Sequence, residues 1–223
     1  MCSSDLLAAA TGAAFVREIF TGTYASDMGP WTPDAGAAMR YRDRLHRKDL
    51  AMLYNVSAEF ADSLDRRSLP DRARSAVFSS IPDAILVSGA ITGEAAAMSD
   101  LEAVKKVLPD TPVLANTGVK HATIADVLRV ADGCIVGSSL KVDGHTWNAV
   151  DADRAVGIDH GRTDLAAGGD RHTRAGVHRA AQVLGRLGDG GARRARGEQQ
   201  FRNLRAHRVV LVRRQREIGR AHV

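Results

Sequence analysis

Three short apolar runs in the chain each end in glycine and hydroxyl-bearing residues. They begin at Ala84, Pro112 and Cys134, and they read AILVSG, PVLANTG and CIVGSS. A short apolar run bounded by turn-forming residues is typical of a buried strand, and amphipathic stretches separate these three runs. Parallel strands need crossover connections, and their sheet must be covered on both faces. The pattern therefore predicts β/α units, which bind ligands at the carboxyl ends of their strands.

Five strand-like segments can be identified between residues 7 and 154. They cover residues 15–20, 50–55, 84–88, the apolar part of 112–118, and 134–136. Each segment is followed by a connection that is wholly or partly helical, so the predicted fold class is α/β with a parallel sheet. A closed barrel of this type needs eight such units, and periodicity alone leaves open whether the sheet is open or closed.

Helix start signals lie between the predicted strands. Thr32 is predicted to cap a helix whose first position is Pro33 and which runs to about residue 45. Ser68 is predicted to cap the helix before the third strand. Ser99 and Glu102 have the spacing of a capping box, so a further helix is predicted to begin there.

The chain consists of two parts with different compositions. Residues 1–154 contain 16 Lys and Arg against 20 Asp and Glu, whereas residues 155–223 contain 15 against 6. All basic residues of the second part are arginine, and no apolar period persists through it. We therefore predict a barrel-like domain over residues 1–154 and a disordered Arg/Gly/Ala-rich tail over residues 155–223.

Two interpretations of the tail remain open. An arginine-rich arm would bind the phosphates of RNA or an acidic membrane surface. The segment has no aromatic residue besides Phe201, however, and no RGG-type repeat. Translation of GC-rich DNA in a shifted frame also yields Arg, Gly and Ala without Lys, and we favour this interpretation. Nucleic acid is therefore not expected as a partner.

The remaining composition bears on location and cofactors. No run of about 18 apolar residues predicts a transmembrane helix, and no basic-then-apolar leader is present. Cys2 and Cys134 are too few for a disulfide framework, so we expect a cytoplasmic protein, with peripheral membrane association left open. Cys134 is expected to be a small buried strand residue. No histidine pair has zinc-ligand spacing with a third partner, so neither a metal nor another cofactor is predicted.

Several motifs resemble the BtpA family in their order and spacing. They are FVREIFTG from Phe15, SDMG from Ser26, VSG from Val87 with TGE from Thr92, DTPVLANTGV from Asp110, and ADGCIVGSSLKVDG from Ala131. The resemblance covers about residues 7–154. It implies a TIM barrel of the ribulose-phosphate-binding type in which the five segments are the fourth to eighth strands. It also implies that the chain is a fragment truncated at its N-terminus.

The resemblance leaves two classes of function open. The first is an enzyme acting on a small phosphorylated ligand, an isomerase or lyase similar to phosphoribosylanthranilate isomerase. The second is a non-catalytic factor for biogenesis of a membrane complex of the photosystem I type, associated with a membrane or a protein partner. The first two motifs resemble the SgcQ branch of the family, found in bacteria without photosynthesis, which argues against a photosystem role. No feature indicates an oligomeric state.

The residues that follow the last two strands predict a phosphate site. A phosphate dianion needs backbone amides that it can approach closely, short hydroxyl groups, and the positive N-terminus of a helix. The candidate phosphate-binding residues are Asn116, Thr117, Gly118, Gly137, Ser138, Ser139 and Lys141. The alternative is that these glycines only turn the chain from strand to helix and that Lys141 is solvent-exposed.

Candidate acid–base residues lie in and after the first two strands. Alternation along residues 15–20 points either Arg17 or Glu18 toward the barrel interior, where a charge is costly unless it is paired or used. We predict Glu18 or Asp27 as the general base. The candidate catalytic residues are thus Glu18, Asp27 and Asn55, with Asn116 and Ser88 as further orienting groups. The alternative for each is a solvated loop charge or a capping amide.

Overall fold

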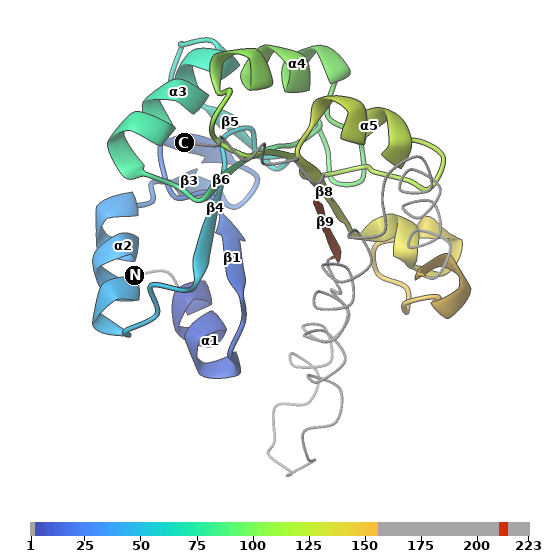
Figure 1. The fold of residues 1–223 in the computed structure, drawn as a ribbon, viewed down its shortest axis with the longest axis horizontal. Coiled ribbons are helices and arrows are strands. Elements are labelled where there is room, and N and C mark those ends of the chain that lie inside the picture. Colours follow the sequence, from blue (N-terminus) through green and yellow to red (C-terminus); the bar gives the residue numbers. More distant parts are fainter. Residues whose placement is uncertain (1–2, 156–209, 214–223) are drawn as a thin grey trace, which may run out of the picture.

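The predicted strands form one curled sheet that makes up half of a barrel. A computed structural model describes residues 3–155 and 210–213 of the chain. Five strands in this part are parallel and follow chain order across the sheet (Figure 1). They are β1 (Phe15–Glu18), β4 (Ala51–Asn55), β6 (Ala84–Val87), β7 (Val113–Ala115) and β8 (Gly133–Val136). The predicted α/β half barrel is therefore confirmed.

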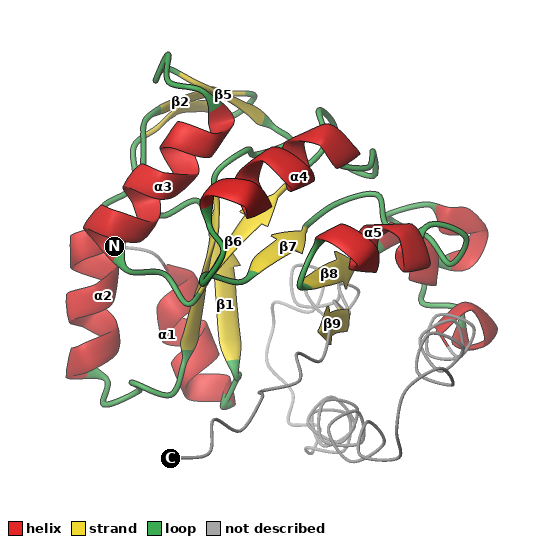
Figure 2. Cartoon of the chain, turned by 45° about the horizontal axis from the view of Figure 1, so that its top comes forward, coloured by secondary structure: helices red, strands yellow, loops and turns green. Residues whose placement is uncertain are grey.

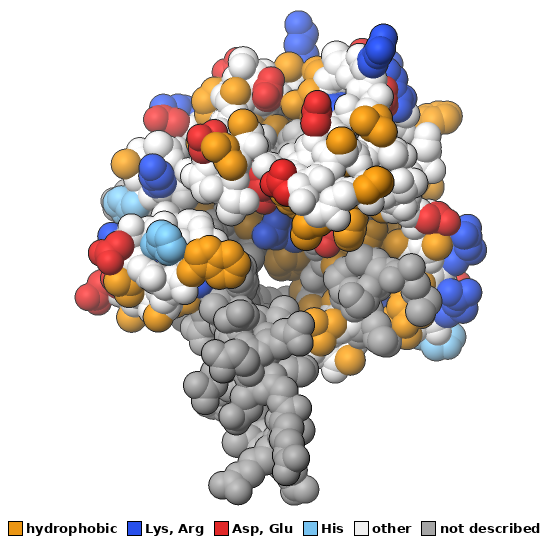
Figure 3. Space-filling model, turned by 180° about the vertical axis from the view of Figure 1, so that it is seen from behind, with side chains coloured by type: hydrophobic (Ala, Val, Ile, Leu, Met, Phe, Trp, Pro, Cys, Tyr) orange, Lys and Arg blue, Asp and Glu red, His pale blue; other side chains and the backbone are white. Residues whose placement is uncertain are grey.

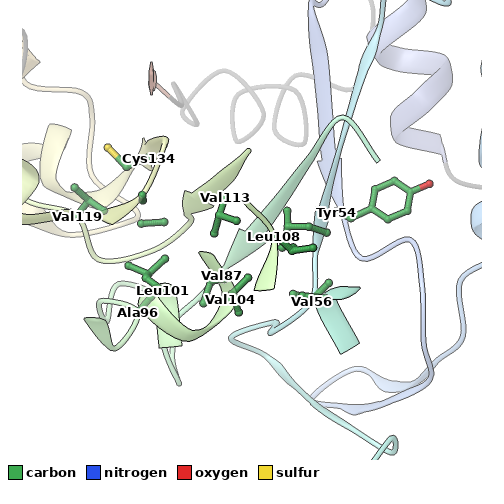
Figure 4. Close-up of a cluster of buried hydrophobic side chains, with 14 of the residues drawn as sticks. Tyr54, Val56, Val87, Ala96, Leu101, Val104, Leu108, Val113, Val119 and Cys134 are labelled. Atoms are coloured by element: carbon green, nitrogen blue, oxygen red, sulfur yellow. The ribbon is translucent and has the colours of Figure 1, made fainter. Parts of the chain in front are cut away.

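Helices cover the convex face of this sheet (Figure 2). They are α1 (Ser3–Thr11), α2 (Ala35–Arg44), α3 (Leu69–Ser80), α4 (Met98–Val107) and α5 (Ile124–Val130). Alternate strand residues pack against them: Val87 and Val113 lie beside Leu101 and Val104 of α4 (Figure 4). All four side chains are completely buried. The helices hold the strands in place, so that the carboxyl ends of all five strands meet on one side of the molecule.

The other alternate residues form a second apolar layer on the concave face. Leu53, Leu86, Leu114 and Ile135 come from four adjacent strands and are at most 3% exposed. Successive strand side chains point to opposite faces. Polar residues two positions further along the same strands must therefore lie on the concave face, above this layer.

Cys134 of β8 belongs to the convex cluster, as expected for a small buried strand residue. Burial raises the pKa of its thiol to about 12. The thiolate is the reactive form, so it is almost absent at neutral pH.

We therefore expect Cys134 to resist alkylation in the folded protein. In a Cys2→Ser variant, iodoacetamide at pH 8 should leave Cys134 unmodified by intact-mass spectrometry until denaturant is added. Stoichiometric modification without denaturant would show that β8 is not buried as described.

A small antiparallel sheet, which the sequence patterns do not predict, lies beyond the carboxyl ends of β1 and β4. It contains β2 (Tyr24–Ser26), β3 (Gly29–Trp31) and β5 (Ala61–Ser63) in the order β3-β2-β5. Its strands have three residues each, too short for a hydrophobic period to be visible. Tyr24 of β2 forms a separate apolar cluster with Ile19 and Ala58.

The first two predicted helix starts have different outcomes in the structure. Helix α2 is capped by Asp34, whose carboxylate accepts a 2.8 Å hydrogen bond from the Ala37 amide. The predicted cap at Thr32 is wrong because this residue only links the end of β3 to Asp34. Helix α3 begins as predicted, with the Ser68 hydroxyl accepting from the Asp71 amide.

The predicted capping box at Ser99 and Glu102 is wrong. Helix α4 already begins at Met98, with Ala97 as its cap and no side-chain hydrogen bond there. Ser99 therefore lies inside the first turn, where it cannot serve as the cap. Met98 packs against the convex core, and this contact extends the helix past the position that the local pattern predicts.

The part of the chain after residue 155 is described only at β9 (Val210–Arg213), which pairs antiparallel with β8. The predicted disorder and the shifted-frame interpretation otherwise fall on residues 156–209 and 214–223, which lie outside the described residues. Among the helices that are described, none has the length and apolar character needed to cross a membrane.

Candidate functional site

A layer of polar side chains lies on the concave face at the carboxyl ends of four strands. Arg17 of β1 donates a 3.0 Å hydrogen bond from Nη1 to Oδ1 of Asn116, which follows β7. Nδ2 of Asn116 lies 2.8 Å from Oγ of Ser88, and Nδ2 of Asn55 lies 3.1 Å from the same hydroxyl. We call Arg17, Asn55, Ser88 and Asn116 the concave network. It joins strands that are far apart in the sequence.

The concave network is largely hidden from solvent. Asn55, Ser88 and Asn116 are between 4% and 6% exposed, and Arg17 is half-buried. Within the described part of the chain no carboxylate lies within ion-pair distance of Arg17. A half-buried guanidinium that meets only a neutral amide is well suited to bind an anion or a developing negative charge.

Of the two charged residues in β1, Arg17 faces the concave side. Its register partner is Leu53 of the concave layer, whereas Glu18 pairs with Tyr54 of the convex cluster. One oxygen of the Glu18 carboxylate accepts a 3.0 Å hydrogen bond from the amide of Ile19. The structure therefore separates Glu18 from the concave network.

Asp27 is also separate from the network. It is an exposed residue of the turn between β2 and β3, and its amide donates to the carbonyl of Phe60 at 3.1 Å. The role of Glu18 or Asp27 as general base stays a prediction. A carboxylate that the sequence patterns did not single out, Glu59, has Oε2 3.4 Å from Nδ2 of Asn55. Its position shortly after a strand end was the only signal for it.

A cleft of about 1010 Å³ lies beside the ends of β7 and β8. Its residues come from the loops that follow β6 and β7 and from the segment after β8. They are Thr92, Gly93, Gly118, Val119, Lys120, His121, Ala122, Ser138, Ser139, Asp143, Gly144, His145, Thr146, Trp147 and Arg154. Gly118, Ser138 and Ser139 of the predicted phosphate site thus share one cavity.

The hydroxyl groups near the cleft have defined partners. Ser138 Oγ lies 2.8 Å from Thr146 Oγ1, and Ser139 Oγ donates to the carbonyl of Val119 at 2.9 Å. Thr117, which is buried, accepts a 2.7 Å hydrogen bond from the Gly89 amide and thereby ties two strand ends together. Ser139 uses its only O–H in the bond to Val119 and can only accept from a ligand, whereas Ser138 can donate to a ligand when Thr146 is the donor between them.

No long helix begins at the predicted phosphate motifs. Ser138–Leu140 forms η1, a 3-10 helix of three residues that starts directly after Gly137, and α5 has seven residues. The helix-dipole part of the phosphate argument therefore contributes little here. Positive side chains are present instead, because Lys120 and Arg154 line the cleft against a single carboxylate, Asp143. Arg154 also lies 3.7 Å from the carboxylate of Asp151.

Lys141 lies away from the cleft wall. It is 2% exposed, and its ammonium group donates to the carbonyl of Asn148 at 3.1 Å.

Seen from behind, the molecule is hollowed near its centre, with a basic side chain inside the hollow (Figure 3). No group of three or more potential metal ligands occurs within the described residues.

Comparison with known protein families shows that residues 2–160 match the BtpA family. The chain is 43% identical over 148 residues to the sgc region protein SgcQ of Escherichia coli K12, covering 66% of this chain and 55% of that protein. It is 32% identical over 153 residues to the photosystem I biogenesis protein BtpA of a Synechocystis strain, covering 68% of this chain and 53% of that protein.

A mitochondrial protein of Caenorhabditis elegans is 31% identical over 147 residues, covering 65% of this chain and 52% of that protein. The chain thus spans about half the length of these relatives. The family match covers most of the described residues, including the concave network and the cleft. This chain therefore belongs to the BtpA family.

Proposed function

We propose that the chain binds a small phosphorylated molecule at the carboxyl-end face of the half barrel, and that the whole protein acts on it as an isomerase or lyase. The proposal rests on one observation, that the concave network and the cleft adjoin each other. Asn116 belongs to the concave network, and Gly118, two residues later, lines the cleft. A ligand with its phosphate in the cleft can therefore extend its other end toward Arg17.

The cleft supports the phosphate part of the proposal. It combines cationic side chains, the hydroxyl of Ser138, and backbone at Gly118. Hydrogen bonds to a charged group contribute about 1.5–3 kcal/mol each, so a few of them suffice to hold a sugar phosphate.

The concave network supports the catalytic part. In an isomerisation, a proton leaves the carbon next to a carbonyl. The electron pair of the broken C–H bond forms a C=C bond, and the π pair of the carbonyl moves to its oxygen. The guanidinium of Arg17 and the amide of Asn116 stabilise the negative charge on that oxygen. We add Glu59, beside Asn55, as a candidate to accept the proton and return it to the neighbouring carbon.

The phosphate site is tested with a pair of lysine variants. Lys120→Gln is expected to weaken binding of ribose 5-phosphate about tenfold, because it removes a cation from the cleft. The control Lys48→Gln removes the same charge from a side chain that is 81% exposed and outside the cleft, and should leave binding unchanged. Isothermal titration calorimetry measures both dissociation constants, with ribose as the ligand that lacks phosphate.

Two results would contradict the proposal. One is equal binding of ribose and ribose 5-phosphate, which would show that phosphate is not recognised. The other is no binding of either compound at millimolar concentration, which would favour the non-catalytic assembly role expected as the alternative.

A further inference from the structure

Trp147 is an exposed aromatic side chain in the wall of the cleft. It is 73% exposed, among the most exposed large hydrophobic residues in the described part of the chain. It belongs to the segment after β8, at the right of Figure 1. The reverse view turns this segment to the left, where histidine and hydrophobic side chains lie together (Figure 3). An indole that faces a polar cavity offers a flat surface to a ligand.

Hydrogen bonds between Val142, which precedes Trp147, and the two residues that follow Trp147 hold the loop that carries the indole. The amide group of Asn148 donates from Nδ2 to the carbonyl of Val142 at 3.0 Å, and the Val142 amide donates to the carbonyl of Ala149 at 3.0 Å. The buried ammonium group of Lys141 donates to the Asn148 carbonyl, so Lys141 acts as a positioning residue for this loop. A fixed loop loses little entropy when a ligand binds.

The same loop is joined to the candidate phosphate site. Thr146, the residue before Trp147, contacts the hydroxyl of Ser138 at 2.8 Å. The segment that carries Trp147 is therefore linked directly to Ser138 of the predicted phosphate site. Two features of one ligand can be recognised together at this place.

We propose that the cleft takes a phosphate ester that carries a flat aromatic ring, with the ring stacked on the indole of Trp147. This inference rests on the proposed function, since it places the phosphate beside Ser138 and Ser139. The cleft of about 1010 Å³ is far larger than a phosphate group needs and is at the upper end of the range for small-molecule sites. A nucleoside monophosphate has both features and serves as the probe.

The expected effect follows from the strength of aromatic stacking. Stacking of a base on an aromatic side chain changes affinity by about tenfold or more. Adenosine 5′-monophosphate should therefore bind about tenfold more tightly than ribose 5-phosphate, which has the same phosphate and sugar without the ring. Trp147→Ala should abolish this difference and leave the affinity for ribose 5-phosphate unchanged.

The experiment measures the dissociation constants of adenosine 5′-monophosphate, ribose 5-phosphate and adenosine on the full chain and on Trp147→Ala. Trp31→Phe is the matched control, because Trp31 lies in β3, outside the cleft, and its replacement should change none of the constants. In this control variant Trp147 is the remaining tryptophan, so its fluorescence should be quenched by adenosine 5′-monophosphate and not by ribose 5-phosphate.

The outcomes separate the two proposals. Equal affinity for adenosine 5′-monophosphate and ribose 5-phosphate overturns the stacking inference and leaves the phosphate site standing. An equal loss of both ligands in Trp147→Ala also overturns it, because the indole would then contact the sugar. Trp147-dependent binding of adenosine that is not strengthened by the phosphate supports the stacking and contradicts the phosphate site. If none of the three compounds binds, both proposals are wrong.

Discussion

Alanine at position 118 is expected to lower the free energy of unfolding by about 3–5 kcal/mol, since backbone strain and overpacking add. Gly118 has a φ of +66°, a backbone angle that residues with a side chain rarely adopt. An added Cβ would also lie 2.1 Å from the amide nitrogen of Ala95 and 2.2 Å from the carbonyl carbon of Glu94. These are backbone atoms, so a side-chain rotation cannot relieve the clash. Urea unfolding followed by circular dichroism measures the change.

Gly12→Ala is the matched control for this prediction. Gly12 has a φ of +69°, but no atom lies within 4 Å of the position where its Cβ would be. This variant should cost only about 1–2 kcal/mol, the strain of the left-handed conformation alone. If Gly118→Ala and Gly12→Ala cost the same, the segment at Glu94 and Ala95 does not pack against Gly118 as described.

The close approach at Gly118 bears on the interpretation of the phosphate motif. The loop that presses against Gly118 also contributes Thr92 and Gly93 to the cleft. Gly118 therefore has a structural role, to let this loop close one side of the cleft. This role is independent of any contact that its amide makes with phosphate.

Arg17→Met is expected to weaken binding of ribulose 5-phosphate about 10- to 150-fold, because it removes a charge-assisted contact to the carbonyl end of the ligand. The free energy of unfolding should fall by about 1 kcal/mol, because the buried Oδ1 of Asn116 loses the hydrogen bond that it accepts from Arg17. Calorimetric titration and urea unfolding of the same variant measure the two quantities.

Arg42→Met is the control for this prediction, because it should affect the stability of the fold and not ligand binding. The Arg42 guanidinium donates to the Leu50 carbonyl at 3.1 Å and pairs with the Asp83 carboxylate at 3.2 Å. Its removal should destabilise the fold by about 1–3 kcal/mol and leave ligand binding unchanged. A loss of stability in Arg17→Met with normal binding would show that Arg17 is a structural residue, and would contradict its proposed role.

Much of the fold could be predicted from local patterns, because strands buried on both faces are continuous apolar runs. This pattern located all five parallel strands to within a few residues. It failed where tertiary contacts decide, as at Met98, whose packing starts α4 before the predicted cap. It also missed the small sheet of β2, β3 and β5, which is too short to show a period.

The candidate site was predictable to a similar extent. Asn55, Ser88 and Asn116 all follow apolar runs, and parallel strands bring such positions together. Alternation narrowed the inward charge to Arg17 or Glu18, but it could not choose between them. The choice depends on register, which pairs Arg17 with Leu53 of the concave layer.

By itself, the sequence determined the α/β architecture and which strand ends carry polar residues, because apolar periodicity and turn residues are local properties. Tertiary structure alone decided which of these groups meet: that Arg17 reaches Asn116, that Lys141 is buried beneath a loop, and that Trp147 faces a cleft. These contacts join residues from separate elements. They depend on the register and curvature of the sheet, which no local pattern specifies.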